Sequence, residues 1–147
     1  MGLSRVVVEV SSTVRKLPIS DARVRKLVEA ALRETKVRDA MVSVAFVGRA
    51  TMSRMNHDYL GHAGPTDVIS FGMGREVRGI PAVGDIYICP EIAARNARTA
   101  GVTLANELSR LVVHGTLHVA GLDHPGDETR TASPMWKKQE WILGRSD

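Results

Sequence analysis

Three of the five histidines of this chain lie in one short stretch, HGTLHVAGLDH, which begins at His114 and ends at His124. Apolar residues recur at helical spacing before and through it, so His114 and His118 are predicted to lie on one face of a helix, one turn or about 5.4 Å apart along its axis. Gly121 permits a positive φ and is expected to end that helix. The chain can then turn back and bring His124 to the same point. The stretch therefore predicts a helix, a sharp turn and three imidazoles around one centre.

Three neutral imidazoles are a ligand set that suits zinc, with bonds of about 2.0–2.1 Å, and they leave the fourth position of a tetrahedral ion open. A structural zinc site normally closes that position with a protein ligand, whereas a catalytic site keeps it for water. Two alternatives remain: the histidines are ordinary core residues, or they hold a structural zinc with Asp123 or another residue as fourth ligand. We favour one catalytic Zn²⁺ per chain, with Asp123 orienting an imidazole N–H or handling a proton.

The histidine spacing, H-x3-H-x2-G-x2-H, is also that of the metzincin proteases, H-E-x-x-H-x-x-G-x-x-H. Those proteases carry their general-base glutamate directly after the first histidine, and this chain has Gly115 there. Glycine cannot accept a proton, so the spacing favours a shared metal cradle without the peptidase chemistry. Glu107 lies about two helical turns before His114 and is expected to be structural.

The rest of the chain is typical of one soluble domain. Its 147 residues, of which 44% are hydrophobic and 24% charged, fit a single core, so residues 1–147 are expected to form one domain. β-branched or alternating runs predict four strands, and helical spacing with capping residues predicts about five helices. We therefore predict an α+β fold with a four-stranded mixed sheet. The strands are expected over residues 6–10, 41–47, 67–71 and 84–89, and the helices after Ser20, over 52–59, from Pro90 to Gly101, from Thr103 to Gly121 and from Pro134 onward.

Nothing in the sequence indicates a membrane or secretion. No run approaches the ~18 apolar residues of a membrane helix, and the start MGLSRVVVEV is typical of a strand and not of a signal peptide. The single cysteine, Cys89, follows an apolar run and is expected to be a buried thiol, which suits a reducing cytoplasm. The net charge of +4 is concentrated in DARVRKLVEAALRETKVRD, which is either a solvated helix face or a surface for a polyanion.

Four segments resemble, in order and spacing, the signatures of the YbeY family. HGTLHVAGLDH resembles H-G-x-L-H-x-x-G-x-D-H, and MNHDYLGHAGPTDVISF resembles the L-N-x-x-Y-R…P-T-D-V-L-S-F block. VGDIYICPEIAARNA is similar to the family's L-G-D-I-x-I block with its following helix, and MWKKQEWIL is similar to the terminal M-x-x-L-Q-E-x-I-L helix. The resemblance covers roughly residues 40–147.

The resemblance implies a zincin-like α+β fold and a zinc ion bound by His114, His118 and His124. It implies a single-strand-specific endoribonuclease that acts in rRNA maturation, at the small-subunit 3′ end, and in ribosome quality control. RNA and ribosomal particles would then be partners, with ribosomal proteins or ribosome-assembly GTPases as further candidates. One departure lies near the histidines: the residue four before His114 is often histidine in the family and is Arg110 here.

The segment that resembles the family's cleft-lining block carries three candidate substrate-binding residues, Thr66, Asp67 and Ser70, whose other explanation is turn and strand capping. The arginine that usually follows the family's tyrosine is Leu60 here, so Arg54, with His62 as the alternative, is a candidate phosphate contact. Leucine cannot contact a phosphate by charge. This keeps open a second function, a ribosome-associated binding factor with a mainly structural zinc and little nuclease activity. A third, a peptidase or another metallohydrolase, is disfavoured by the missing glutamate.

Overall fold

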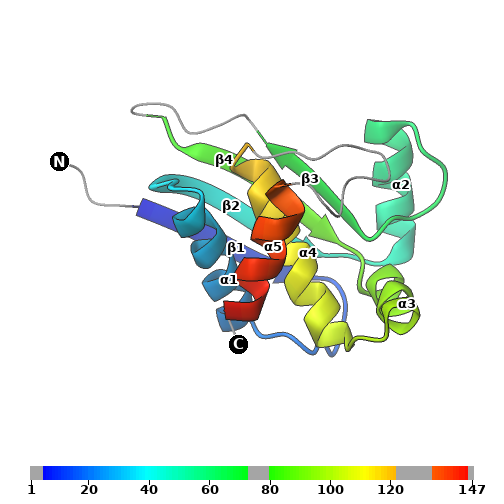
Figure 1. Ribbon diagram of the computed structural model, residues 1–147. Coiled ribbons are helices and arrows are strands. Elements are labelled where there is room, and N and C mark those ends of the chain that lie inside the picture. Colours follow the sequence, from blue (N-terminus) through cyan, green and yellow to red (C-terminus); the bar gives the residue numbers. More distant parts are fainter. Residues whose placement is uncertain (1–4, 73–79, 122–133, 146–147) are drawn as a thin grey trace.

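The computed structural model describes residues 5–72, 80–121 and 134–145 (Figure 1). That part of the chain contains four strands and five helices, so the predicted α+β content is confirmed. In chain order they are β1 (Arg5–Ser12), α1 (Asp21–Glu34), β2 (Asp39–Phe46), α2 (Arg49–Leu60), β3 (Val68–Gly72), β4 (Ala82–Ile88), α3 (Pro90–Ala100), α4 (Leu104–Val119) and α5 (Pro134–Arg145).

The sheet is mixed, as predicted, and has the strand order β1-β2-β4-β3. Strands β1, β2 and β4 are parallel, and β3 pairs antiparallel with β4 at one edge. The observed strands overlap all four predicted ranges, with ends that differ by one or two residues. Strand ends depend on hydrogen bonds to neighbouring strands, which a local sequence pattern does not contain.

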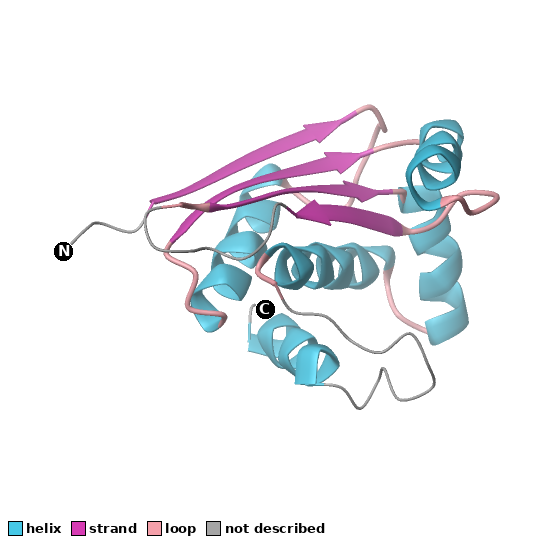
Figure 2. Cartoon of the chain, turned by 90° about the horizontal axis from the view of Figure 1, so that it is seen from above, coloured by secondary structure: helices cyan, strands magenta, loops and turns pink. Residues whose placement is uncertain are grey.

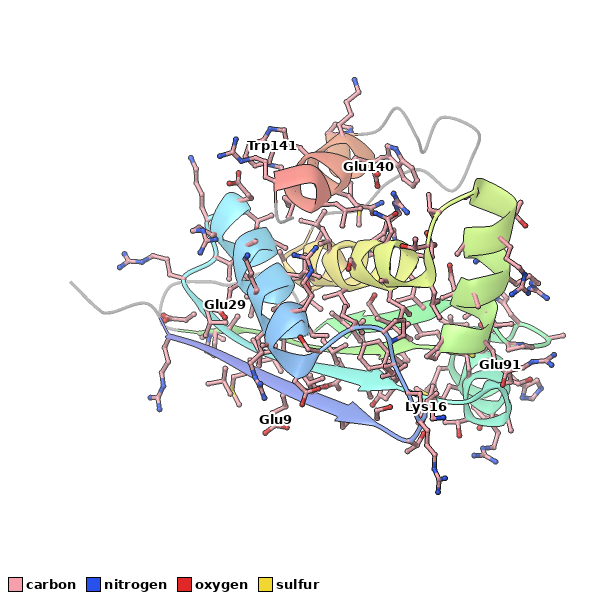
Figure 3. The ribbon with its side chains drawn as sticks, turned by 90° about the horizontal axis from the view of Figure 1, so that it is seen from below. Glu9, Lys16, Glu29, Glu91, Glu140 and Trp141 are labelled. Atoms are coloured by element: carbon pink, nitrogen blue, oxygen red, sulfur yellow. The ribbon has the colours of Figure 1, made fainter. Side chains whose placement is uncertain are left out.

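Three layers make up the molecule. Helices α1 and α4 cover one face of the sheet, and α5 packs on the outer side of α4 (Figure 2). The strand side chains on the helical face belong to the larger core cluster, in which Val44, Ile86 and Ile88 have no exposed surface, and a smaller cluster includes Met52 and Ile69. Glu9 projects from the opposite face of the sheet (Figure 3). Helix α4 is therefore enclosed between the sheet and α5, with α1 and α3 on its two flanks (Figures 2 and 3).

The helix boundaries follow the predicted capping residues. The side chains of Ser20 and Thr103 each accept a backbone N–H from the first turn of their helix, at 3.1 and 3.0 Å. Pro90 begins α3, and Gly101 follows it with φ of 71°. Gly121 has φ of 97°, directly after the cap of α4. These ends were predictable because capping depends on the residues of one turn.

Two further predictions concern burial and membranes. Cys89 is a free thiol with no exposed surface, so its predicted burial is confirmed. Within the described residues, no helix combines the length and apolar character that crossing a membrane requires.

Two glycines allow α4 to lie directly on the sheet. A Cβ on Gly115 would lie 2.7 Å from Cγ2 of Ile86, and a Cβ on Gly84 would meet the side chain of Val119. Gly115 therefore faces the sheet. Successive helix residues are about 100° apart, so His114 and His118 lie on a flank of α4 instead.

Candidate active site

His114 and His118 form a pair on α4. Both side chains are half-buried, their ring centroids are 4.7 Å apart and their ring planes cross at 72°. The spacing of four residues predicted that these two side chains lie next to each other on one helix. Two imidazoles at this separation can bind one ion, which is the first requirement of the proposed metal site.

The remaining predicted members of that site, Asp123 and His124, lie outside the described residues. Among the residues that the structure describes, no group of three histidine, cysteine or carboxylate side chains is placed to hold a metal. The described part of the site thus contains two of the three predicted ligands.

The hydrogen bond of His114 fits a metal ligand. Its Nδ1 lies 2.7 Å from the side-chain oxygen Oε1 of Gln139, on α5. An amide oxygen only accepts, so Nδ1 carries the hydrogen and the lone pair of a neutral ring is on Nε2. Metal-binding histidines commonly donate their other ring N–H to an oxygen in this way. The donor chemistry of this residue therefore suits zinc.

A cavity of about 470 Å³ opens beside His114. Helices α3, α4 and α5 and the residues at the start of β3 form its walls. Its polar lining consists of Asp67, Asn96, Glu107, Arg110, His114, Gln139 and Glu140, and its less polar lining consists of Val68, Ala100, Val102, Leu111 and Trp136. The cavity therefore combines several polar and charged groups with apolar surface, and His114 of the histidine pair is part of its lining.

Arg110 lies between two carboxylates in this cavity. Its Nη1 donates to Oε1 of Glu107 at 2.9 Å, while its Nε and Nη2 donate to the two oxygens of Glu140 at 2.9 and 3.1 Å. Burial raises the pKa of Glu107 above its usual value although Arg110 opposes this rise. Burial also acts to raise the pKa of Glu140, but hydrogen bonds from Arg110 and Gln139 outweigh it and the pKa is lowered. Glu107 has the contacts expected of a structural residue, and it also lines the cavity.

This ion-pair cluster leads to a prediction about stability. Arg110→Met should reduce the free energy of unfolding at neutral pH by about 3 kcal/mol, the low end for a broken buried pair, because Glu140 is 35% exposed. The loss should shrink as the pH falls below about 4, since protonated carboxyls no longer need the cation. The sign follows from the lowered pKa of Glu140, whose stabilising contribution is lost from the native protein as the pH falls through that pKa. Urea unfolding of the native protein and the variant, at neutral pH and below about pH 4, measures the loss of free energy. An equal loss at both pH values would contradict the prediction.

The predicted substrate-binding residues are only partly brought together. Asp67 lines the cavity, where its Oδ2 accepts from Nδ2 of Asn96 at 3.2 Å and its Oδ1 accepts from the backbone N–H of the next residue at 2.8 Å. The hydroxyl of Thr66 is 3.4 Å from Oδ1 of Asp67. Ser70 lies further along β3 and Arg54 is exposed on α2; neither is among the described residues that line the cavity.

Most of the cavity residues were not predicted as site residues from the sequence, among them Asn96, Trp136, Gln139 and Glu140. These four come from α3 and α5, which are distant from the histidines in the chain. A signal for two of them existed, because Gln139 and Glu140 occupy the Q-E positions of the terminal helix that resembles the family's. Arg110 was noticed only as a departure from the family.

The basic segment lies away from the cavity. Arg25 and Lys26 are exposed on α1, and α1 covers the flank of α4 opposite α3 (Figures 2 and 3). The cavity opens between α3, α4 and α5. This arrangement fits a solvated helix face, the first of the two interpretations of that segment.

Comparison with known proteins places the chain in a family. The family described as Endoribonuclease YbeY matches residues 9–147. A relative of that name from Geobacter sulfurreducens is 36% identical over 139 residues, which cover 92% of this chain and 93% of the relative. Another from Pelotomaculum thermopropionicum is 37% identical over 145 residues, which cover 92% of this chain and 94% of the relative.

The fold is also found among solved structures. The solution structure of TM1509 from Thermotoga maritima superposes with a TM-score of 0.64 and 28% identity, covering 95% of this chain and 89% of that one. The solved structure shares the α+β fold, and the family model and the relatives identify the class of protein, an endoribonuclease. The chain belongs to the YbeY family.

Proposed function

We propose that this protein is a zinc-dependent endoribonuclease that cleaves single-stranded RNA, acting on the 3′ end of small-subunit rRNA and in ribosome quality control. The observation that carries the proposal is the imidazole pair of His114 and His118, with ring centroids 4.7 Å apart beside a cavity that contains polar and charged groups, in a chain of an endoribonuclease family. The ribosomal substrate and partners, including ribosomal proteins or assembly GTPases, rest on the family resemblance. We take residues 1–147 as one metal-dependent hydrolase domain.

In this proposal His114, His118 and His124 hold the ion through ring nitrogens. Bound there, a zinc ion would lower the pKa of a water molecule to about 7 and would stabilise charge on a phosphate oxygen. The chain's own contribution begins with ligand orientation. Gln139 accepts a hydrogen bond from Nδ1–H of His114. The lone pair of the neutral ring is then on Nε2, the nitrogen that would bind the ion.

Proton transfer must use a group other than the metzincin glutamate. Gly115 has no proton-accepting side chain, and a side chain at that position would point at Ile86 in the sheet. We propose Asp123, adjacent in sequence to His124, as the group that handles the proton or orients a ligand. Glu107 is a second carboxyl that can hold a proton in the cavity, because burial raises its pKa.

RNA needs both polar contacts and positive charge. The hydroxyls and carboxylate of Thr66, Asp67 and Ser70, at and near the start of β3, are of the right chemistry for ribose hydroxyls and base edges. Arg54, exposed on α2, is our proposed phosphate contact. The carboxylates of the cavity itself would repel phosphates, so the RNA backbone on either side of the cleaved phosphate is expected to pass outside the cavity.

The test is cleavage of a single-stranded RNA that carries a small-subunit 3′ end, with the same sequence in a duplex as the matched substrate. Cleavage restricted to the single strand, lost with a chelator and restored by zinc, is the expected result. A zinc-loaded protein that binds small ribosomal subunits without cutting would instead establish the second function, a binding factor. The observation that favours this alternative is Leu60, which is 47% exposed where the family usually has arginine.

Restoring that charge gives a further prediction. Leu60→Arg should strengthen binding of single-stranded RNA, because a guanidinium at an exposed position can reach a phosphate. If one phosphate contact is gained, the slope of log K against log salt should become more negative by about 0.7. Fluorescence anisotropy over a salt series measures the slope, and Leu60→Gln is the neutral control. An unchanged slope in the arginine variant would show that RNA does not pass this part of α2.

A further inference from the structure

The side-chain hydrogen bonds around Gln139 form one continuous network from Arg110 to His114. Arg110 donates to both oxygens of Glu140, at 2.9 and 3.1 Å. Nε2 of Gln139 also donates to Glu140, at 2.9 Å from Oε2. On its other side, Oε1 of Gln139 lies 2.7 Å from Nδ1 of His114. This network joins two helices, α4 and α5.

In each hydrogen bond of the network, only one of the two groups can be the donor. A guanidinium donates and never accepts, so the carboxylate of Glu140 must accept from Arg110. An ionised carboxylate has no hydrogen to give, so the side of the Gln139 amide that faces it must be the NH₂ group. The amide oxygen of Gln139 then faces His114.

The direction carries through to the imidazole ring. Because Oε1 of Gln139 can only accept, Nδ1 of His114 must carry a hydrogen. A neutral His114 is therefore the Nδ1–H tautomer, and its lone pair is on Nε2. Which ring nitrogen bears the hydrogen is set by the hydrogen bond made at the other.

We infer that Gln139 is a positioning residue that sets the tautomer of His114, and that Arg110 and Glu140 impose the orientation of Gln139. As a statement about the metal site, this inference rests on the proposed function, because the lone pair matters there as a ligand. As a statement about the tautomer, it stands without a metal. It makes α5 part of the site, although Gln139 is 25 residues from His114 in the chain.

Burial keeps the amide from turning over. Gln139 is 1% exposed, so water cannot replace a lost partner. A flipped amide would set NH₂ against the N–H of His114 and oxygen against the carboxylate of Glu140. The two hydrogen bonds would become one donor–donor contact and one acceptor–acceptor contact, and each buried unsatisfied group costs about 1–3 kcal/mol. Figure 3 shows Glu140 and Trp141 on different sides of α5, with Glu140 on the side towards α3.

The first experiment reads the tautomer directly in the metal-free full-length protein. Two-dimensional ¹⁵N–¹H NMR of the histidine rings, at a pH well above the usual imidazole pKa of about 6.5, distinguishes Nδ1–H from Nε2–H. The native chain should show His114 as Nδ1–H. Gln139→Met, which keeps an unbranched side chain of similar length, should shift His114 towards the Nε2–H tautomer that predominates for histidine in water.

Two more variants keep the test decisive. Glu140→Gln retains the size of the side chain but allows either amide orientation, so it should give a mixture of tautomers even if Gln139→Met folds poorly. Lys137→Gln changes an exposed residue of the same helix and should leave the native tautomer. A native His114 found as Nε2–H, or an unchanged Nδ1–H tautomer in both Gln139→Met and Glu140→Gln, would overturn the inference.

The second experiment measures zinc affinity by competition with a chromophoric chelator. Gln139→Met should bind zinc about 10–100-fold more weakly, the range for loss of a residue that orients a ligand. The experiments distinguish failure of the proposed metal site from failure of the positioning role of Gln139. A native chain with the Nδ1–H tautomer but no zinc binding would remove the proposed metal site and leave the tautomer result intact. Tight zinc binding that is equal in the native chain and Gln139→Met would overturn the positioning role and leave the metal site.

Discussion

His114→Ala should abolish tight zinc binding and lower the rate of RNA cleavage by about a thousandfold or more. A metal ion contributes several kcal/mol to stabilising a phosphoryl transition state, and each 1.4 kcal/mol corresponds to about tenfold in rate. The variant removes a proposed zinc ligand and leaves Gln139 without its hydrogen-bond partner at 2.7 Å. Cleavage rates with single-stranded RNA and the zinc content of the purified protein are the two measurements.

The chain offers a matched control for this experiment. His57 lies on α2 with its side chain 76% exposed, so His57→Ala removes an imidazole without touching α4. It should bind zinc and cleave RNA as the native protein does. A folded His114→Ala protein that still cleaved the RNA would place the activity at another site or in a contaminant, and the metal site would have to be abandoned.

Gly115→Ala should destabilise the protein by about 1–3 kcal/mol, the usual range for overpacking, although alanine is the better helix former. The added Cβ would lie 2.7 Å from Cγ2 of Ile86, which is itself fully buried. Gly115→Glu should be worse, because a charged group would also enter the core beneath α4. Chemical denaturation followed by circular dichroism measures both.

Two controls separate the steric effect from helix propensity. Gly144→Ala adds a methyl group to α5 where nothing lies within 4 Å, so it should be neutral or stabilising by up to about 1 kcal/mol. Gly115→Ala combined with Ile86→Ala should be less destabilising than the sum of the single changes, since the space for Cβ is then open. Additive losses would show that Ile86 is not what makes this position require glycine.

The glycine also bears on the choice between enzyme classes. In the metzincin spacing, the residue after the first histidine carries the base and must reach the metal-bound water. In this fold the same position faces Ile86 and the sheet. Inserting a glutamate there is therefore expected to disrupt packing without producing a peptidase, which a casein or peptide-library assay would check.

Local features of the site could be predicted from the sequence. His114 and His118 lie side by side because a spacing of four residues is one helical turn, whatever the rest of the fold does. Thr103 and Gly121 mark the ends of the same helix because capping involves groups within a turn of each end. The four strands were predictable for a similar reason, although their order in the sheet was not.

The contacts that complete the site were decided by tertiary structure. Arg110 could be recognised from the sequence only as a departure from the family, and its partner Glu140 lies 30 residues away on another helix. Likewise, no local pattern shows that the amide of Gln139 meets His114, or that Arg54 lies outside the cavity while Asp67 lines it. The sequence by itself determined the helix, the histidine pair and the family. Only the packing of α5 on α4 and of α4 on the sheet decided which polar groups surround that pair, because such contacts join residues that no helical or strand period connects.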